Sequence, residues 1–218
     1  MIDYKQIALQ NNCRSAAHLN ELFWHTISSY WIKKYTDAFP KHGEISLQNF
    51  FGFAFLIDHV WPDVQEADSN NELPETRVIS FFGISNTNIV KENRSRMKKG
   101  WGKTSQAFST FGVDFDKGHF IAHGFGGPVD VNIFPQRRDI NRGWSDEGKL
   151  YRKMEKFVAA NPGTFVFSRP VYNDLTICPY QLEYGYFDKD LELTIQTFPN
   201  SYLTLPGAPS SSPGICLV

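Results

Sequence analysis

Residues 114–155 constrain the fold more than any other part of the chain; they read DFDKGHFIAHGFGGPVDVNIFPQRRDINRGWSDEGKLYRKME. Phe115, Phe120 and Ile121 surround a histidine and are typical of a strand edge, and a glycine-rich turn follows. The end of the segment predicts a helix that runs to about Ala160 and stops at residues 161–163, Asn-Pro-Gly. We therefore expect a strand, a loop and a helix in close succession.

The same segment carries side chains suited to hydrolysis of a phosphodiester. His119 is a candidate general base, because an imidazole is neutral near pH 7. Asn141 offers a neutral carbonyl oxygen to a hard cation such as Mg²⁺, and Glu155 could accept hydrogen bonds from metal-bound water. Each residue also has a purely structural interpretation: a core histidine, a helix N-cap, and a surface glutamate paired with Lys149 or Arg152.

The first 75 residues predict helices. Residues 15–38 show apolar side chains at helical spacing, with Ser15 as the cap and Pro40 as the stop. The apolar positions expected to face the core are Leu19, Leu22, Phe23, Ile27, Tyr30 and Trp31. A second helix is expected after Ser46 and before Pro62, and its phenylalanines are interpreted as core.

The remaining segments predict strands and connections. Residues 63–76 are acidic and polar, as in a linker, and residues 77–83 predict a strand. Residues 164–172 predict a strand with a break, and residues 180–187 and 191–198 predict a hairpin around Asp188-Lys189-Asp190. The chain therefore divides into a helical region 1–75 (adaptor, regulatory or packing), an α+β domain 76–203 with a mainly antiparallel sheet, and a flexible Pro/Ser/Gly-rich tail 204–218.

Composition and charge narrow the class of protein. Of 218 residues, 41% are hydrophobic, enough to bury a core, and the net charge of -1 does not indicate a nucleic-acid binder. The charge is uneven, however: residues 91–103, KENRSRMKKGWGK, predict a phosphate-contacting surface, although most charge runs are solvated loops. Three scattered cysteines disfavour a disulfide framework or a cysteine zinc site. With no signal peptide and no long apolar run, we expect a soluble protein, cytoplasmic or exported by a dedicated secretion system.

The order of the motifs resembles a known family. D-x-G-H, N-I-x-P-Q and D-x-N-R-G are followed by a helix with aromatic-x-x-M-E, and G-H-x-I-A is followed by F-G-G. This order resembles the DNA/RNA non-specific endonucleases, which are ββα-metal (His-metal finger) enzymes, and above all the nuclease domains of bacterial polymorphic toxins. The similarity covers residues 94–200. It implies a ββα-metal core, a Mg²⁺ cofactor that Mn²⁺ can replace, DNA or RNA as substrate, and a cognate inhibitor protein.

The resemblance assigns roles by position. His119 matches the general base, Asn141 the direct metal ligand, and Glu155 the helical glutamate that holds metal-bound water. Asn132 matches the asparagine that buttresses the site, and Asp116 the acid that opens the histidine motif. The residues expected to contact phosphate are Arg94 or Arg96, Lys117 and Arg142.

Two departures from the family pattern keep alternatives open. Lys117 stands where the family often has arginine, which removes a bidentate phosphate contact. The segment WSDEGKL (144–150) lengthens the interval between Asn141 and Glu155, and it contains Glu147 as a rival for the supporting role. The alternatives are a catalytically weak or inactive nuclease-fold module that binds nucleic acid and a protein partner, or a two-histidine zinc enzyme that recruits His123.

Overall fold

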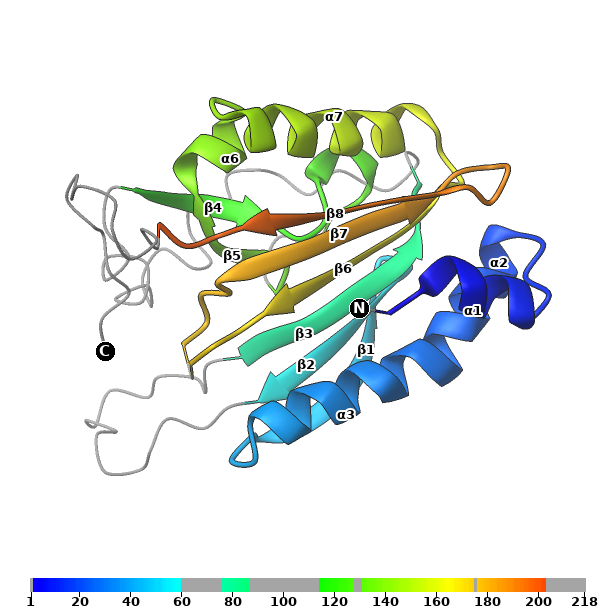
Figure 1. Cartoon of the computed structure of the whole chain (residues 1–218), viewed down its shortest axis with the longest axis horizontal. Coiled ribbons are helices and arrows are strands. Elements are labelled where there is room, and N and C mark those ends of the chain that lie inside the picture. Colours follow the sequence, from blue (N-terminus) through cyan, green and yellow to red (C-terminus); the bar gives the residue numbers. More distant parts are fainter. Residues whose placement is uncertain (1, 60–75, 87–113, 128–130, 175, 203–218) are drawn as a thin grey trace.

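The computed structural model describes residues 2–59, 76–86, 114–127, 131–174 and 176–202 (Figure 1). Residues 63–75 of the expected linker, the basic run with Arg94, Arg96 and Trp101, and the C-terminal tail lie outside these residues.

A six-stranded sheet forms the centre of the fold, and every neighbouring pair in it is antiparallel. The strand order is β1-β2-β3-β6-β7-β8. The strands are β1 (Glu44–Phe50), β2 (Phe53–His59), β3 (Thr76–Ile84), β6 (Phe165–Val171), β7 (Gln181–Phe187) and β8 (Leu193–Pro199). The predicted α+β class and mainly antiparallel sheet are therefore confirmed.

The second predicted N-terminal helix is wrong, because its residues form the β1–β2 hairpin. The turn consists of Phe51 and Gly52, with φ of 55° and 87°, and conformations of this kind interrupt a helix. Asn49 closes it by accepting a hydrogen bond from the Gly52 amide at 3.2 Å. The run from Phe53 to Ile57 is buried on both faces of the sheet, so it lacks the apolar–polar alternation by which a strand is recognised.

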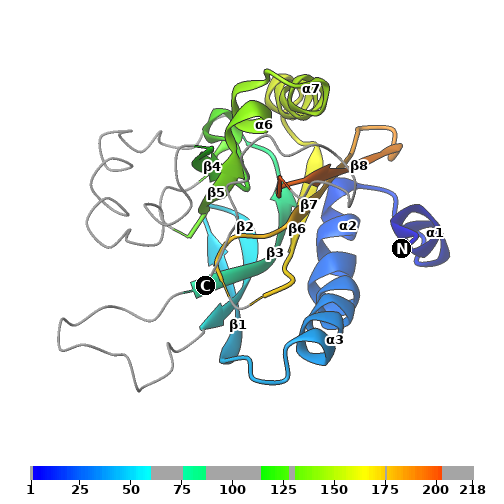
Figure 2. The same cartoon turned by 60° about the vertical axis from the view of Figure 1, so that its left-hand side comes forward.

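One face of the sheet is covered by the N-terminal helices α1 (Tyr4–Gln10), α2 (Ala16–Leu22) and α3 (Ser28–Ala38) (Figures 1 and 2). A π-helical segment, η1 (Phe23–Ile27), joins α2 to α3, so the predicted helix from 15 to 38 is present with one local irregularity. Ser15 caps it, as expected, by accepting from the His18 amide. Tyr30 is an exception to the predicted apolar face, because its side chain is 44% exposed.

The opposite face of the sheet carries the elements of residues 114–160. A two-stranded antiparallel sheet, β4 (Phe115–His119) and β5 (Ile133–Arg137), packs there with the 3-10 turn η2 (His123–Phe125). The helices α6 (Arg138–Arg142) and α7 (Asp146–Ala160) lie over it (Figure 2). The core on this face joins both sheets to α7 through Phe120, Phe134, Tyr151, Met154 and Tyr184.

The C-terminal strands mostly agree with the sequence. The hairpin β7–β8 and the end of α7 at Ala160 are confirmed. The predicted break in residues 164–172 is wrong, because β6 is continuous through Pro170. The pairing of β6 with β3 stops at Ser168, so the missing amide hydrogen of Pro170 falls where β6 has only β7 beside it.

Residues 2–59 contribute two strands as well as helices, so the description of region 1–75 as helical is corrected. The division of the chain at residues 75 and 203 stays a prediction. No helix in the described ranges has the length and apolar character needed to cross a membrane.

Candidate active site

His119 is the last residue of β4, as the sequence predicted, and its side chain is half-buried. The glycine before it is required by packing. A Cβ at Gly118 would lie 2.4 Å from both Cβ and Oε1 of Gln136, its near neighbour on β5. Gly118 therefore leaves room for the Gln136 side chain beside the point where β4 ends and His119 lies.

Asn132 fixes the backbone directly after His119. Its side chain is fully buried, and the amide of Ile121 donates to its Oδ1 at 2.7 Å while its Nδ2 donates to the Ile121 carbonyl at 2.8 Å. The Phe120 amide donates to the Asn132 carbonyl at 2.9 Å. Gly127 lies against the same clamp, since a Cβ there would be 2.1 Å from the Ile121 carbonyl oxygen. Asn132 thus occupies a buttressing position.

Asp116 joins β4 to α6. Arg142 donates to both of its oxygens, at 2.6 and 3.1 Å, and Arg138 donates to Oδ1 at 3.1 Å. The side-chain nitrogen of Asn141 lies 3.4 Å from Oδ2. Burial by itself would raise the pKa of Asp116, but the hydrogen bonds from these three residues outweigh it and hold that pKa below its usual value. Asp116 is therefore an anion that positions Asn141.

The helix α7 ties His119 and Asn141 to each other. The Tyr151 hydroxyl donates to the His119 carbonyl at 3.2 Å, and the adjacent Arg152 donates to the Asn141 carbonyl at 3.1 Å. Two consecutive residues of one helix thus hold the backbones of the candidate base and the candidate metal ligand.

The alternative interpretation of Asn141 as the N-cap of the long helix is wrong. Asn141 lies within α6, and Ser145 caps α7 by accepting from the Gly148 amide at 3.0 Å. The WSDEGKL segment forms the turn between the helices and the first residues of α7. Gly148 allows the helices to touch, because a Cβ there would lie 2.5 Å from the Asp139 carbonyl oxygen.

Glu155 lies one helical turn after Tyr151 and is half-buried, whereas Glu147 is exposed in the first turn of α7. Burial raises the pKa of Glu155 to about 7, and nearby Arg152 offsets part of that shift. Its charge in turn helps to raise the pKa of Tyr151 and Tyr184, after the larger effect of their own burial. Glu155 therefore faces inward, on the side of α7 that binds the His119 carbonyl.

This burial predicts a pH dependence of stability in the metal-free protein. The folded state binds the Glu155 proton more tightly than the unfolded state, where the pKa is about 4.5, so stability from protonated Glu155 is lost as pH rises from about 4.5 through about 7. Urea unfolding in a chelating buffer should show wild type losing about 1–3 kcal/mol relative to Glu155→Gln between about pH 5 and 8. Glu147→Gln is the matched control, and a constant difference across this range would contradict the assignment.

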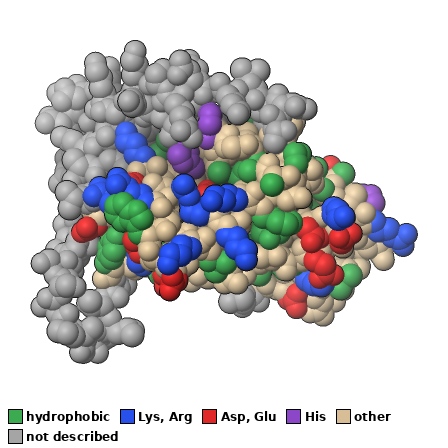
Figure 3. All heavy atoms as spheres, turned by 90° about the horizontal axis from the view of Figure 1, so that it is seen from above, with side chains coloured by type: hydrophobic (Ala, Val, Ile, Leu, Met, Phe, Trp, Pro, Cys, Tyr) green, Lys and Arg blue, Asp and Glu red, His purple; other side chains and the backbone are tan. Residues whose placement is uncertain are grey.

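Lys and Arg side chains gather on the face formed by α6 and α7, with histidines beside them (Figure 3). The exposed members are Arg142, Lys149, Arg152, Lys153 and Lys156. Of the residues expected to contact phosphate, Arg142 lies on this face, and Lys117 is half-buried on β4. The structure therefore supplies a basic surface beside the candidate site, and its exposed members are residues other than those of the run at 91–103.

Three contributors to the site were missed from the sequence. Arg138 shares Asp116 with Arg142, Tyr151 anchors His119, and Trp144 is 61% exposed beside Arg142. The acid and the two arginines are more than 20 residues apart, so only the pairing of β4 with β5 brings them together. Trp144 could have been noticed in the sequence, because it is an aromatic residue in a polar segment three positions after Asn141.

No family model matches the chain, and no curated protein matches its sequence. Among solved structures, the chain is similar to that of Sda1 nuclease with bound zinc ion, at 17% identity, over 72% of this chain and 73% of that chain, with a TM-score of 0.37. At this TM-score and identity the likeness assigns neither a detailed fold nor an activity to this chain.

Proposed function

We propose that this protein is a Mg²⁺-dependent, sequence-non-specific endonuclease that hydrolyses phosphodiester bonds of DNA, with RNA as an alternative substrate. One observation carries the proposal: the side chains of Tyr151 and Arg152 on α7 donate hydrogen bonds to the backbone carbonyls of His119 and Asn141. In this proposal β4, β5 and the helices that follow form a ββα-metal core. The order β4, β5, α6, α7 along the chain supports it.

His119 is proposed as the general base. His119 ends β4 with a half-buried imidazole, and the Tyr151 hydroxyl and the Asn132 clamp hold its own carbonyl and the backbone of Ile121. A fixed backbone limits the positions that the ring can take, as removal of a proton from an attacking water requires.

The donors around Asn141 fit a hard cation. A carboxylate only accepts hydrogen bonds, so Asp116 binds the side-chain nitrogen of Asn141. The side-chain oxygen of Asn141 is then left as the metal ligand. When bound there, Mg²⁺ would stabilise the negative charge that develops on the phosphate and the leaving oxygen. In the described part of the chain no group of three or more His, Cys, Asp or Glu side chains could hold a metal, so this proposal relies on the amide oxygen.

Glu155 is proposed to hold the water around the cation. The structure supports it over Glu147, because Glu155 is half-buried one turn beyond the residues that bind His119 and Asn141. A nearby cation favours the ionised carboxylate and would oppose the effect of burial on its pKa.

Arg142, Lys117 and the run with Arg94 and Arg96 are proposed to hold phosphates. The resemblance to toxin nuclease domains extends the proposal to an antibacterial effector with a cognate inhibitor protein, because such an activity would damage the cell that makes it. A thermal-shift or pull-down experiment with a candidate inhibitor would test that part separately.

The function is tested by removal of the metal. Purified protein should degrade plasmid DNA with Mg²⁺ or Mn²⁺, and an excess of chelator should abolish degradation, because the arginines and lysines hold phosphates but do not replace the cation that would stabilise the leaving oxygen. Gel electrophoresis of the plasmid gives the rate. Cleavage that survives chelation would contradict the metal requirement, and retention of DNA without cleavage under any divalent metal would support the nucleic-acid-binding module instead.

A further inference from the structure

Trp144 presents a large aromatic surface at the edge of the candidate site. Its side chain is 61% exposed, and the Arg142 guanidinium lies 4.9 Å from the ring centroid. The same guanidinium binds both oxygens of Asp116, which lies 3.4 Å from the Asn141 amide nitrogen. Three successive contacts, through Arg142 and Asp116, therefore connect the indole ring to Asn141, the residue proposed to hold the metal.

The backbone around Trp144 is fixed on both sides. The Trp144 amide donates to the Asp139 carbonyl at 2.8 Å, and Gly143 takes a left-handed φ of 71° that ends α6. Ser145, the next residue, caps α7. An aromatic side chain on a rigid turn loses little conformational entropy when a ligand covers it, which favours its use in binding.

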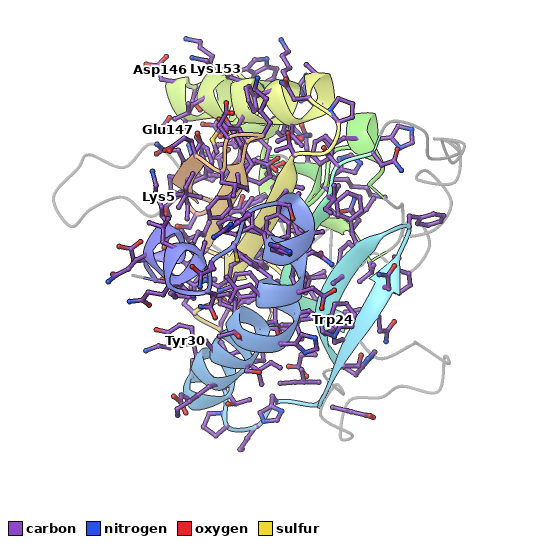
Figure 4. The ribbon with its side chains drawn as sticks, turned by 90° about the vertical axis from the view of Figure 1, so that its right-hand side faces the viewer. Lys5, Trp24, Tyr30, Asp146, Glu147 and Lys153 are labelled. Atoms are coloured by element: carbon purple, nitrogen blue, oxygen red, sulfur yellow. The ribbon has the colours of Figure 1, made fainter. Side chains whose placement is uncertain are left out.

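The surface around Trp144 is basic. Arg138 and Arg142 lie before it, and Arg152, Lys153 and Lys156 lie along α7. Lys153 points outward from α7 (Figure 4), and no ion pair of Lys153 or Lys156 occurs among the described residues. Cations attract phosphates, and an indole ring stacks on a nucleobase, so the combination suits a nucleic-acid strand better than an apolar partner.

Stacking on Trp144 requires an unpaired base. Inside a duplex, both faces of each base are covered by neighbouring base pairs, so an external ring has no face to cover. Arg142 lies over one face of the indole, and the large exposure of the side chain leaves the other to a ligand. We propose that Trp144 is a stacking platform for an unpaired nucleobase, and that the site consequently takes single-stranded nucleic acid in preference to duplex. The proposal rests on the proposed nuclease function, since it places the base beside the phosphate to be cleaved.

The test is a binding measurement that does not depend on cleavage. Fluorescence anisotropy compares a labelled single-stranded oligothymidylate with a labelled blunt hairpin duplex, both with Mg²⁺ in a His119→Ala background. We expect Trp144→Ala to weaken single-strand binding by about 5-fold to about 150-fold, the usual range for loss of one stacked base. Duplex binding should change by less than about twofold, because it depends on the charges that remain.

Two further variants sharpen the test. Trp144→Phe keeps a ring and should restore most of the single-strand affinity. Tyr30→Ala is the matched control: Tyr30 is exposed on α3 with Lys34 5.6 Å from its ring centroid, and it lies on the opposite side of the molecule from α7 (Figure 4). It should leave both affinities unchanged.

Three outcomes would overturn the proposal. Equal weakening for both probes would make Trp144 a general structural or electrostatic element. Unchanged single-strand affinity would exclude stacking, and failure of the parent to bind either probe would exclude nucleic acid as the ligand of this surface. If wild type fails to cleave but Trp144→Ala selectively loses single-strand binding, the nuclease function fails while the platform stands.

Discussion

Replacement of His119 by alanine should lower the rate of plasmid cleavage by about 10²-fold to 10⁴-fold, the usual contribution of a positioned general base. The fold should survive, because the group that Tyr151 binds is the backbone carbonyl of residue 119, which the substitution keeps. The measurement is the initial cleavage rate with Mg²⁺, together with a circular dichroism spectrum of the variant. Added imidazole should restore part of the rate, since it supplies the missing base in solution.

His123 provides the comparison for this experiment. It is a half-buried histidine on the η2 turn, four residues after His119. In the proposed mechanism it takes no part, so His123→Ala should cleave at the wild-type rate. A comparable loss in both variants, together with stoichiometric zinc in the purified protein, would replace the proposal by the two-histidine zinc enzyme. Activity that survives both chelation and His119→Ala would exclude the mechanism altogether.

Replacement of Asn132 by alanine should destabilise the protein by about 2–4 kcal/mol, because it leaves the buried amide and carbonyl of Ile121 without their side-chain partner. Cleavage should also fall, since the segment after His119 loses the clamp that holds it. Urea denaturation measures the first effect. The cleavage rate, measured well below the temperature at which the variant unfolds, measures the second.

The variant Asn200→Ala is the control that separates a loss of protein stability from a loss of His119 positioning. Asn200 is also buried, and its side chain binds the Arg137 amide and the Pro135 carbonyl, each at 2.8 Å, at the far end of β5. Its loss should lower the free energy of unfolding by a similar amount to Asn132→Ala, but the Asn132 clamp at Ile121 stays in place. The cleavage rate should therefore fall less than in Asn132→Ala. Equal losses of activity in the two variants would show that Asn132 acts only through general stability.

Much of the site's local geometry could be predicted from the sequence. The phenylalanines and isoleucine around His119 predicted a strand edge, and His119 does end β4. The stop at Asn161-Pro162-Gly163 predicted the end of α7, and the polar turn at Asp188-Lys189-Asp190 predicted the β7–β8 hairpin. These features depend on a few neighbouring residues, whose steric and hydrogen-bonding preferences are the same in any fold.

The hairpin β1–β2 could not be predicted in this way. Five consecutive apolar residues, Phe53 to Ile57, are compatible with either a buried helix or a strand covered on both faces. The choice depends on what lies above and below, and here α1–α3 cover one face while the elements of residues 114–160 cover the other.

The sequence by itself determined where the reactive residues lie along the chain and which local turns carry them, because glycine, proline and capping residues act over a few positions. Only the tertiary structure decided their partners. Asp116 meets Arg138 and Arg142, α7 binds the backbones of His119 and Asn141, and Trp144 stays exposed beside them. The physical reason is that these contacts join residues up to 32 positions apart, and their distances depend on strand pairing and helix packing across the whole molecule.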